Sequence, residues 1–136
     1  MADEAVLVWE TELPIPFKCA NATGIAKGAV LKLTESMTAI ITSGAKDACA
    51  GIAAAEKIAS DGSVTIPVYM AGIFKCTAAA AILIGAPLST SATANRLQTA
   101  TGSNGATVIG YALEAPSGNG QTFLAAIRIG TGGELA

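Results

Sequence analysis

The chain has 136 residues, a formal net charge of −2 at pH 7 and no histidine, and 13% of its residues are charged. Its length fits one domain with its own core. The lysines and arginines are scattered, which predicts no nucleic-acid partner. No apolar run reaches the ~20 residues needed to cross a bilayer, which predicts no membrane partner. The acidic N-terminus differs from a secretory leader, so we expect cytoplasmic synthesis, and the low charge favours a surface that protein partners cover.

An apolar segment that contains two prolines opens the chain. Residues 6–9 are Val-Leu-Val-Trp, and residues 13–19 then alternate apolar side chains with proline and lysine. Alternation predicts a strand, but proline cannot donate a ladder hydrogen bond, so this strand belongs at a sheet edge or in an extended arm. We interpret residues 1–18 as an N-terminal arm or edge strand, and we expect residues 1–12 to be mobile until a partner covers them.

Short β-rich segments separated by turn residues make up the rest of the chain, which is typical of an all-β barrel or sandwich. Residues 47–59 are rich in alanine, which favours a helix, but Gly51 opposes a helix and we expect a strand at 51–55. Thr77 can cap one short helical turn at 78–81. The other segments that we expect to be strands are 29–34, 38–41, 64–70, 72–77, 87–90, 96–99, 108–113 and 123–129.

Three landmarks of the first half return in the second half at offsets of 57, 59 and 58 residues. They are Gly28-Ala29-Val30-Leu31 with Gly85-Ala86-Pro87-Leu88, Gly51-Ile52-Ala53 with Gly110-Tyr111-Ala112, and a strand closed by Gly72 with one closed by Gly130. We predict two pseudo-repeated β units, about 25–76 and 82–130, in one β-barrel domain at 19–130, followed by a flexible tail at 131–136. Chance similarity between glycine- and alanine-rich segments is the alternative.

The residues of common active sites are missing. Without histidine, neither a Ser-His-Asp nor a Cys-His arrangement is possible within one chain. The three cysteines, Cys19, Cys49 and Cys76, form no C-x-x-C pair, so we expect buried free thiols rather than zinc ligands. The Gly-rich segments lack the spacing of a phosphate-binding loop. We therefore expect a protein that is not an enzyme and has no catalytic residue, metal or cofactor.

Six segments in a fixed order carry a resemblance to a known family. They are 25–31, 50–53, 64–68, 71–76, 81–88 and 108–115. Their order and spacing resemble the head decoration, or capsid cement, proteins of tailed phages. The resemblance implies a small β-barrel that binds the exterior of an assembled capsid, commonly as a homotrimer, after synthesis in the host cytoplasm. Its partner would be the major capsid protein. The stretches 34–50 and 102–107 depart from the family pattern, so contact residues are not carried over.

The N-terminal arm supplies the candidate capsid contacts, because it is more apolar than a free tail. An arm can add a strand to a neighbour's open sheet edge; the alternative is that it packs back on its own barrel. The function that we expect is a structural virion protein that stabilises the head by bridging capsid subunits. The alternative is a small β-barrel carbohydrate- or ligand-binding module of a phage tail, against which the few, dispersed aromatic residues count. The candidate contact residues are Val6, Val8, Trp9, Leu13, Ile15 and Phe17.

Overall fold

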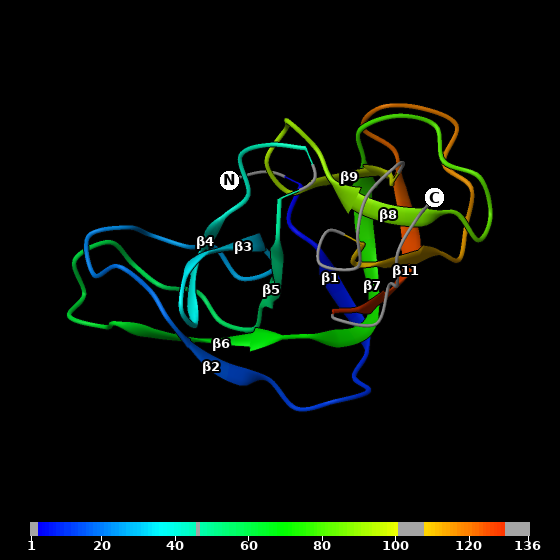
Figure 1. Cartoon of the computed structure of the whole chain (residues 1–136). Coiled ribbons are helices and arrows are strands. Elements are labelled where there is room, and N and C mark those ends of the chain that lie inside the picture. Colours follow the sequence, from blue (N-terminus) through cyan, green and yellow to red (C-terminus); the bar gives the residue numbers. More distant parts are fainter. Residues whose placement is uncertain (1–2, 46, 101–107, 130–136) are drawn as a thin grey trace.

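Two small closed β-sheets lie side by side in the computed structural model (Figure 1), which describes residues 3–45, 47–100 and 108–129. Within these residues all regular structure is β-strand, and there are eleven strands. They are β1 (Val6–Trp9), β2 (Ile15–Lys18), β3 (Val30–Glu35), β4 (Thr38–Ile41), β5 (Cys49–Ala53), β6 (Thr65–Tyr69), β7 (Ala71–Ala78), β8 (Pro87–Thr90), β9 (Arg96–Thr99), β10 (Gly110–Ala112) and β11 (Thr122–Arg128). The all-β prediction is confirmed.

The two barrels repeat one topology. The first closes in the order β2-β4-β3-β5-β6, and the second closes in the matching order β7-β9-β8-β10-β11. Each is antiparallel except for one parallel pairing, β2 with β4 and β7 with β9. The prediction of two pseudo-repeated β units is therefore confirmed, and β1 is an extra strand on β7.

The strand registers match residue by residue. Leu31 of β3 lies opposite Gly51 and Ile41, and Leu88 of β8 lies opposite Gly110 and Thr99. These pairs differ by 57, 59 and 58 residues, the offsets of the sequence landmarks. Because β7 pairs with β11 and β9, we propose that the boundary between the units falls near residue 70 rather than 76. The predicted tail at 131–136 lies outside the described residues.

Two of the landmark glycines are required by close packing of backbone. Gly51 and Gly110 have φ values of +138° and +154°, which residues other than glycine rarely adopt. A Cβ at Gly51 would overlap the carbonyl oxygen of Tyr69, and a Cβ at Gly110 would overlap that of Ala126. The same backbone approach in both barrels therefore explains why this glycine recurs in the sequence.

The hydrophobic core is shared between the barrels. One cluster fills the first barrel around Phe17, Leu31 and Ile66. A larger cluster fills the second barrel around Phe74 and Phe123 and also takes in Val30, Cys49 and Ile52 of the first barrel. Burying these side chains together joins the two barrels without a linker domain.

The three cysteines are free and buried, as expected. Burial raises the pKa of both Cys49 and Cys76 to about 12, because a thiolate loses its hydration there. Protonated buried thiols are poor nucleophiles and poor metal ligands. These side chains therefore act as small apolar core groups.

The predicted helical turn at 78–81 is wrong. Ala78 ends β7, and its N–H donates to the carbonyl of Gln121 at 2.8 Å. The N–H of Ala79 donates to the carbonyl of Leu97 at 2.7 Å. Both neighbours in the sheet supply acceptors that a helix would otherwise have supplied within the segment, so pairing overrides the local alanine preference.

The N-terminal segment also differs from the expected free arm. Residues 6–9 form β1, which pairs antiparallel with β7, and Ala5 before it is buried. The guanidinium of Arg96 donates from Nε to Oδ2 of Asp3 at 2.7 Å. Residues 3–9 thus pack on their own chain, while residues 1–2 lie outside the described residues.

The proline of β2, Pro16, lies in a closed barrel rather than at a free sheet edge, but beside a gap in the strand's pairing. β2 pairs with β6 along its length but with β4 only through Lys18 and Thr38. The N–H of Lys18 donates to the carbonyl oxygen of Met37 across this junction at 2.6 Å. Because alternate residues of a strand turn their backbone nitrogens to the same neighbour, the nitrogen of Pro16 lies on this side too. Its missing N–H therefore falls where β2 has no paired neighbour among the described strands.

Candidate interface

The structure keeps five of the six predicted contact residues at the surface. Trp9 is 62% exposed and Leu13 is 77% exposed, and Val6, Val8 and Ile15 also reach solvent. Phe17 differs from the expectation, because only 4% of it is exposed and its ring packs in the first barrel. We call the five exposed residues the arm patch: Val6, Val8, Trp9, Leu13 and Ile15.

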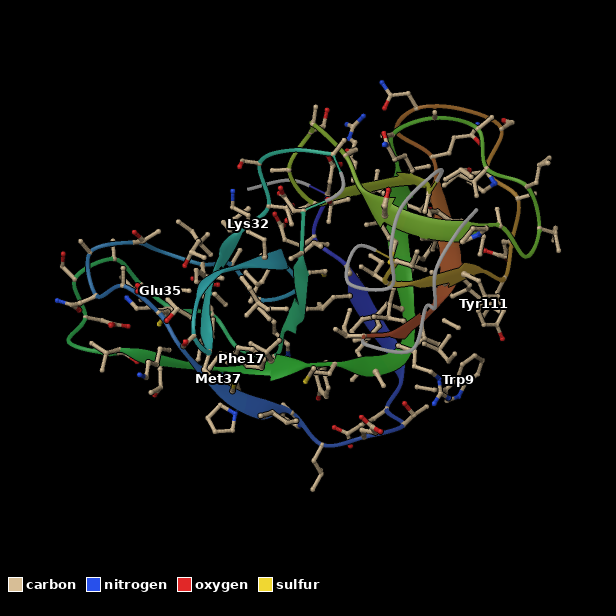
Figure 2. All side chains as sticks on the ribbon, in the orientation of Figure 1. Trp9, Phe17, Lys32, Glu35, Met37 and Tyr111 are labelled. Carbon is tan, nitrogen blue, oxygen red and sulfur yellow. The ribbon has the colours of Figure 1, made fainter. Side chains whose placement is uncertain are left out.

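The register of β1 on β7 decides which arm side chains face outward. Leu7 lies opposite buried Phe74 and packs against the core, whereas Val6 lies opposite exposed Lys75. The register shifts between Leu7 and Trp9, and Trp9 then lies opposite Ile73. This bulge keeps Trp9 on the outward side, at the outer side of the second barrel in Figure 2.

Strand β1, which carries Val6, Val8 and Trp9 of the arm patch, is anchored at both ends. Before β1, the N–H of Ala5 donates to the carbonyl of Gly28 at 2.8 Å. After β1, the hydroxyl of Tyr69 donates to Oε2 of Glu10 at 2.9 Å, which raises the pKa of Tyr69. A partner would therefore meet a preformed surface, and binding would not have to order a free chain.

Sequence reasoning missed a second exposed apolar area, on the second barrel. Leu83 and Ile84 are 79% and 69% exposed in the loop before β8. They adjoin β10, because the N–H of Gly85 donates to the carbonyl of Ala112 at 2.8 Å, and Tyr111 of β10 is also exposed. Aligning the two repeats would have shown it, since Leu83 and Ile84 stand where the first repeat has Ala26 and Lys27.

The exposed apolar side chains are the most prominent feature of the described surface. In the part of the chain that the structure describes, no three Asp, Glu or Cys side chains gather to hold a metal ion. Among the same residues no helix is long and apolar enough to cross a membrane. What stands out is apolar side chains displayed on rigid strands and a short loop. Exposed apolar patches of this kind are typical of surfaces that contact other proteins.

Comparison with known proteins identifies the family. Residues 9–129 match the family model described as phage cement protein, and the chain belongs to this family. It is therefore a structural protein associated with the phage capsid, found in the virion, which confirms the resemblance seen in the sequence. No curated protein matches the chain.

A solved structure has the same fold. The N base of head fiber gp8.5 from bacteriophage phi29 aligns with a TM-score of 0.57 and 14% sequence identity, over 90% of this chain and 96% of that chain. At this identity the likeness shows the shared fold alone.

Proposed function

We propose that this protein binds the outer surface of an assembled phage capsid as a homotrimer, bridges neighbouring major capsid subunits and thereby stabilises the shell, after synthesis in the host cytoplasm. The observation that carries this proposal is the arm patch. It places apolar side chains on one anchored segment of a protein that belongs to the cement family.

The energetics favour attachment through this patch. Full burial of one large apolar side chain contributes about 1.5–3 kcal/mol, and Val6, Trp9 and Leu13 are each more than half exposed. Because residues 3–9 are already held on the barrels, binding avoids most of the ~1–2 kcal/mol per residue that ordering a free segment costs. Three copies in one trimer would multiply a modest contact through avidity.

The topology offers a specific way to bridge. Among the described strands, β1 is the last strand of its sheet, paired only with β7. Its other edge is available to an added strand from a capsid subunit, with main-chain hydrogen bonds providing affinity. The arm thus acts as the receiving edge rather than as the invading strand.

The test is a double substitution in the arm patch, Trp9→Ser with Leu13→Ser, assayed for attachment to purified empty shells. We expect attachment to weaken at least tenfold, or about 1.4 kcal/mol, while the melting temperature stays within a few degrees. Ile58→Ser is the matched control, because Ile58 is also exposed but lies on the loop between β5 and β6. Undiminished attachment of the double variant would overturn the proposed contact.

A carbohydrate site is the competing function, since Trp9 and Tyr111 both lie on the outer side of the second barrel (Figure 2). The register places Ile73 and Ala126 between them across β7 and β11. Neither side chain can hydrogen-bond a sugar hydroxyl, which favours a protein partner on this face. Saturable binding of soluble glycans that is lost in the Trp9→Ser variant would favour the carbohydrate function instead.

A further inference from the structure

The contact between the two barrels of one chain is asymmetric. The tip of the β8–β9 hairpin enters the first barrel's surface. There, Oδ1 of Asn95 accepts a hydrogen bond from the N–H of Val30 at 3.0 Å. The hydroxyl of Thr90 donates to the carbonyl of Gly44 at 2.8 Å and accepts from the N–H of Asp47 at 2.9 Å. The second barrel thus provides a hairpin tip, and the first barrel provides the surface that receives it.

The side chains at the equivalent tip of the first barrel stay exposed. The registers that pair the repeats place Met37 at the position of Asn95 and Leu33 at the position of Thr90. Met37 and Asn95 have the same backbone form, with φ of 51° and 69° directly before β4 and β9. Asn95 is 1% exposed, whereas Met37 is 48% and Leu33 is 41% exposed. Figure 2 shows Met37 on the first barrel, away from the second.

The receiving surface is likewise filled on one barrel and open on the other. On the first barrel the hairpin tip and the N-terminal segment together cover this surface. Val30 and Ile52 are buried there, and a Cβ at Gly28 would overlap the carbonyl oxygen of Ala5 in the N-terminal segment. A Cβ at Gly85, the matching glycine of the second barrel, would meet open space. The second barrel's matching positions, with the adjoining Leu83, form what we call the socket: Leu83, Ile84, Pro87 and Tyr111.

The tip and the receiving surface differ between the two barrels in complementary ways. The first barrel offers the N–H of Val30, and the tip that meets it carries an amide oxygen. The second barrel has Pro87 at that position, which has no N–H to donate, and the unused tip carries Met37, whose thioether needs no donor. A Met side chain fits an irregular apolar surface, whereas an asparagine there would bury an unpartnered amide.

We propose that the hairpin tip of one copy, Leu33 and Met37, docks into the socket of a second copy and so repeats between chains the junction found within the chain. Such a contact is heterologous: each copy uses its tip for one neighbour and its socket for another. Closure of this contact after three copies would give the homotrimer of the proposed function, on which this inference rests. The interface would be apolar where the internal one is polar.

Two exposed substitutions test the pairing. Met37→Asp charges the tip and is compatible with a positive φ, and Ile84→Asp charges the socket. We expect each variant to lower self-association at least tenfold in sedimentation or light-scattering measurements. An equimolar mixture should form dimers, because the intact socket of the first variant still accepts the intact tip of the second. Ile58→Asp, on an exposed residue outside both surfaces, should assemble like the wild type.

Three results would overturn the inference: a wild type that is monomeric at every concentration, charged variants that assemble normally, or a mixture that stays monomeric. Attachment to empty shells is measured separately with the arm patch variant. A protein that attaches to shells but shows none of the tip-and-socket behaviour retains the proposed capsid binding and refutes this inference. A protein that shows the pairing but never attaches refutes capsid binding instead.

Discussion

The hydrogen bond between Asn95 and Val30 makes a measurable prediction about how the barrels are joined. Asn95→Ala removes the amide that accepts from the buried N–H of Val30 at 3.0 Å and that donates to Oε2 of Glu4 at 3.3 Å. It also puts alanine at a φ of 69°, a conformation that asparagine tolerates better. Both changes destabilise the folded state.

The magnitude follows from these two effects. A buried donor left without its acceptor costs about 1–3 kcal/mol, and a left-handed backbone costs an ordinary L-residue about 1–2 kcal/mol. Because asparagine already bears part of the backbone term, we expect Asn95→Ala to lower the free energy of unfolding by about 2–4 kcal/mol. At about 3–5 °C per kcal/mol for a chain of this size, the melting temperature should fall by about 6–20 °C.

Thermal unfolding followed by calorimetry or circular dichroism provides the assay, and two further variants separate the terms. Asn95→Gly loses the amide but adopts positive φ freely, so it should fall between the wild type and Asn95→Ala. Met37→Gly removes no buried hydrogen bond at the equivalent, exposed position, so the monomer should melt at or above the wild-type temperature. An Asn95→Ala variant that melts within about 2 °C of the wild type would refute the argument.

The remaining predictions concern the backbone, the thiols and one carboxylate. Gly110→Ala should cost more than about 2 kcal/mol and reduce soluble yield, because its Cβ overlaps a carbonyl oxygen, whereas Gly118→Ala, which meets open space, should melt like the wild type. Burial raises the pKa of Cys49 and Cys76 to about 12, so both thiols should resist alkylation at pH 8 in the native protein and react on unfolding. Mass spectrometry measures the labelling. Labelling of the native protein as fast as that of an exposed thiol would contradict their burial. Backbone N–H groups, first that of Ser63, lower the pKa of Asp61, so Asp61→Asn should be less stable than the wild type at pH 7. This difference should shrink as the pH falls through the usual aspartate range near 4, and a difference that grows on acidification would reverse the assigned sign.

Local patterns predicted the strands because each strand is short and bounded by turn residues. Residues 38–41, 87–90 and 96–99 form strands with the expected bounds. The equivalence of Gly51 and Gly110 could be recognised from the sequence, because a positive φ beside a carbonyl oxygen admits glycine alone. The structural constraint therefore fixes the residue type at both positions. These recurring glycines also revealed the duplication.

Contacts between distant segments require no single residue type and so could not be recognised from the sequence. The alanine run at 78–81 satisfies a helix locally, but Gln121, just before β11, and Leu97 of β9 accept the hydrogen bonds of Ala78 and Ala79. The apolar arm gave no sign of its partner, because β7 begins 62 residues after Trp9. Phe17 looked like a contact residue because alternation shows which residues share a face, not which face the core covers.

The sequence by itself determined the strand content, the repeat, the missing donor at Pro16 and the family. These depend on backbone geometry and on interactions over a few residues. Only the tertiary structure decided that the arm folds onto the second barrel, that one hairpin tip is buried and its equivalent exposed, and which apolar side chains remain for partners. Those outcomes depend on which of the two barrels of matching topology receives the hairpin tip of the other, and contacts between distant residues, such as the junction of Asn95 with Val30, decide it.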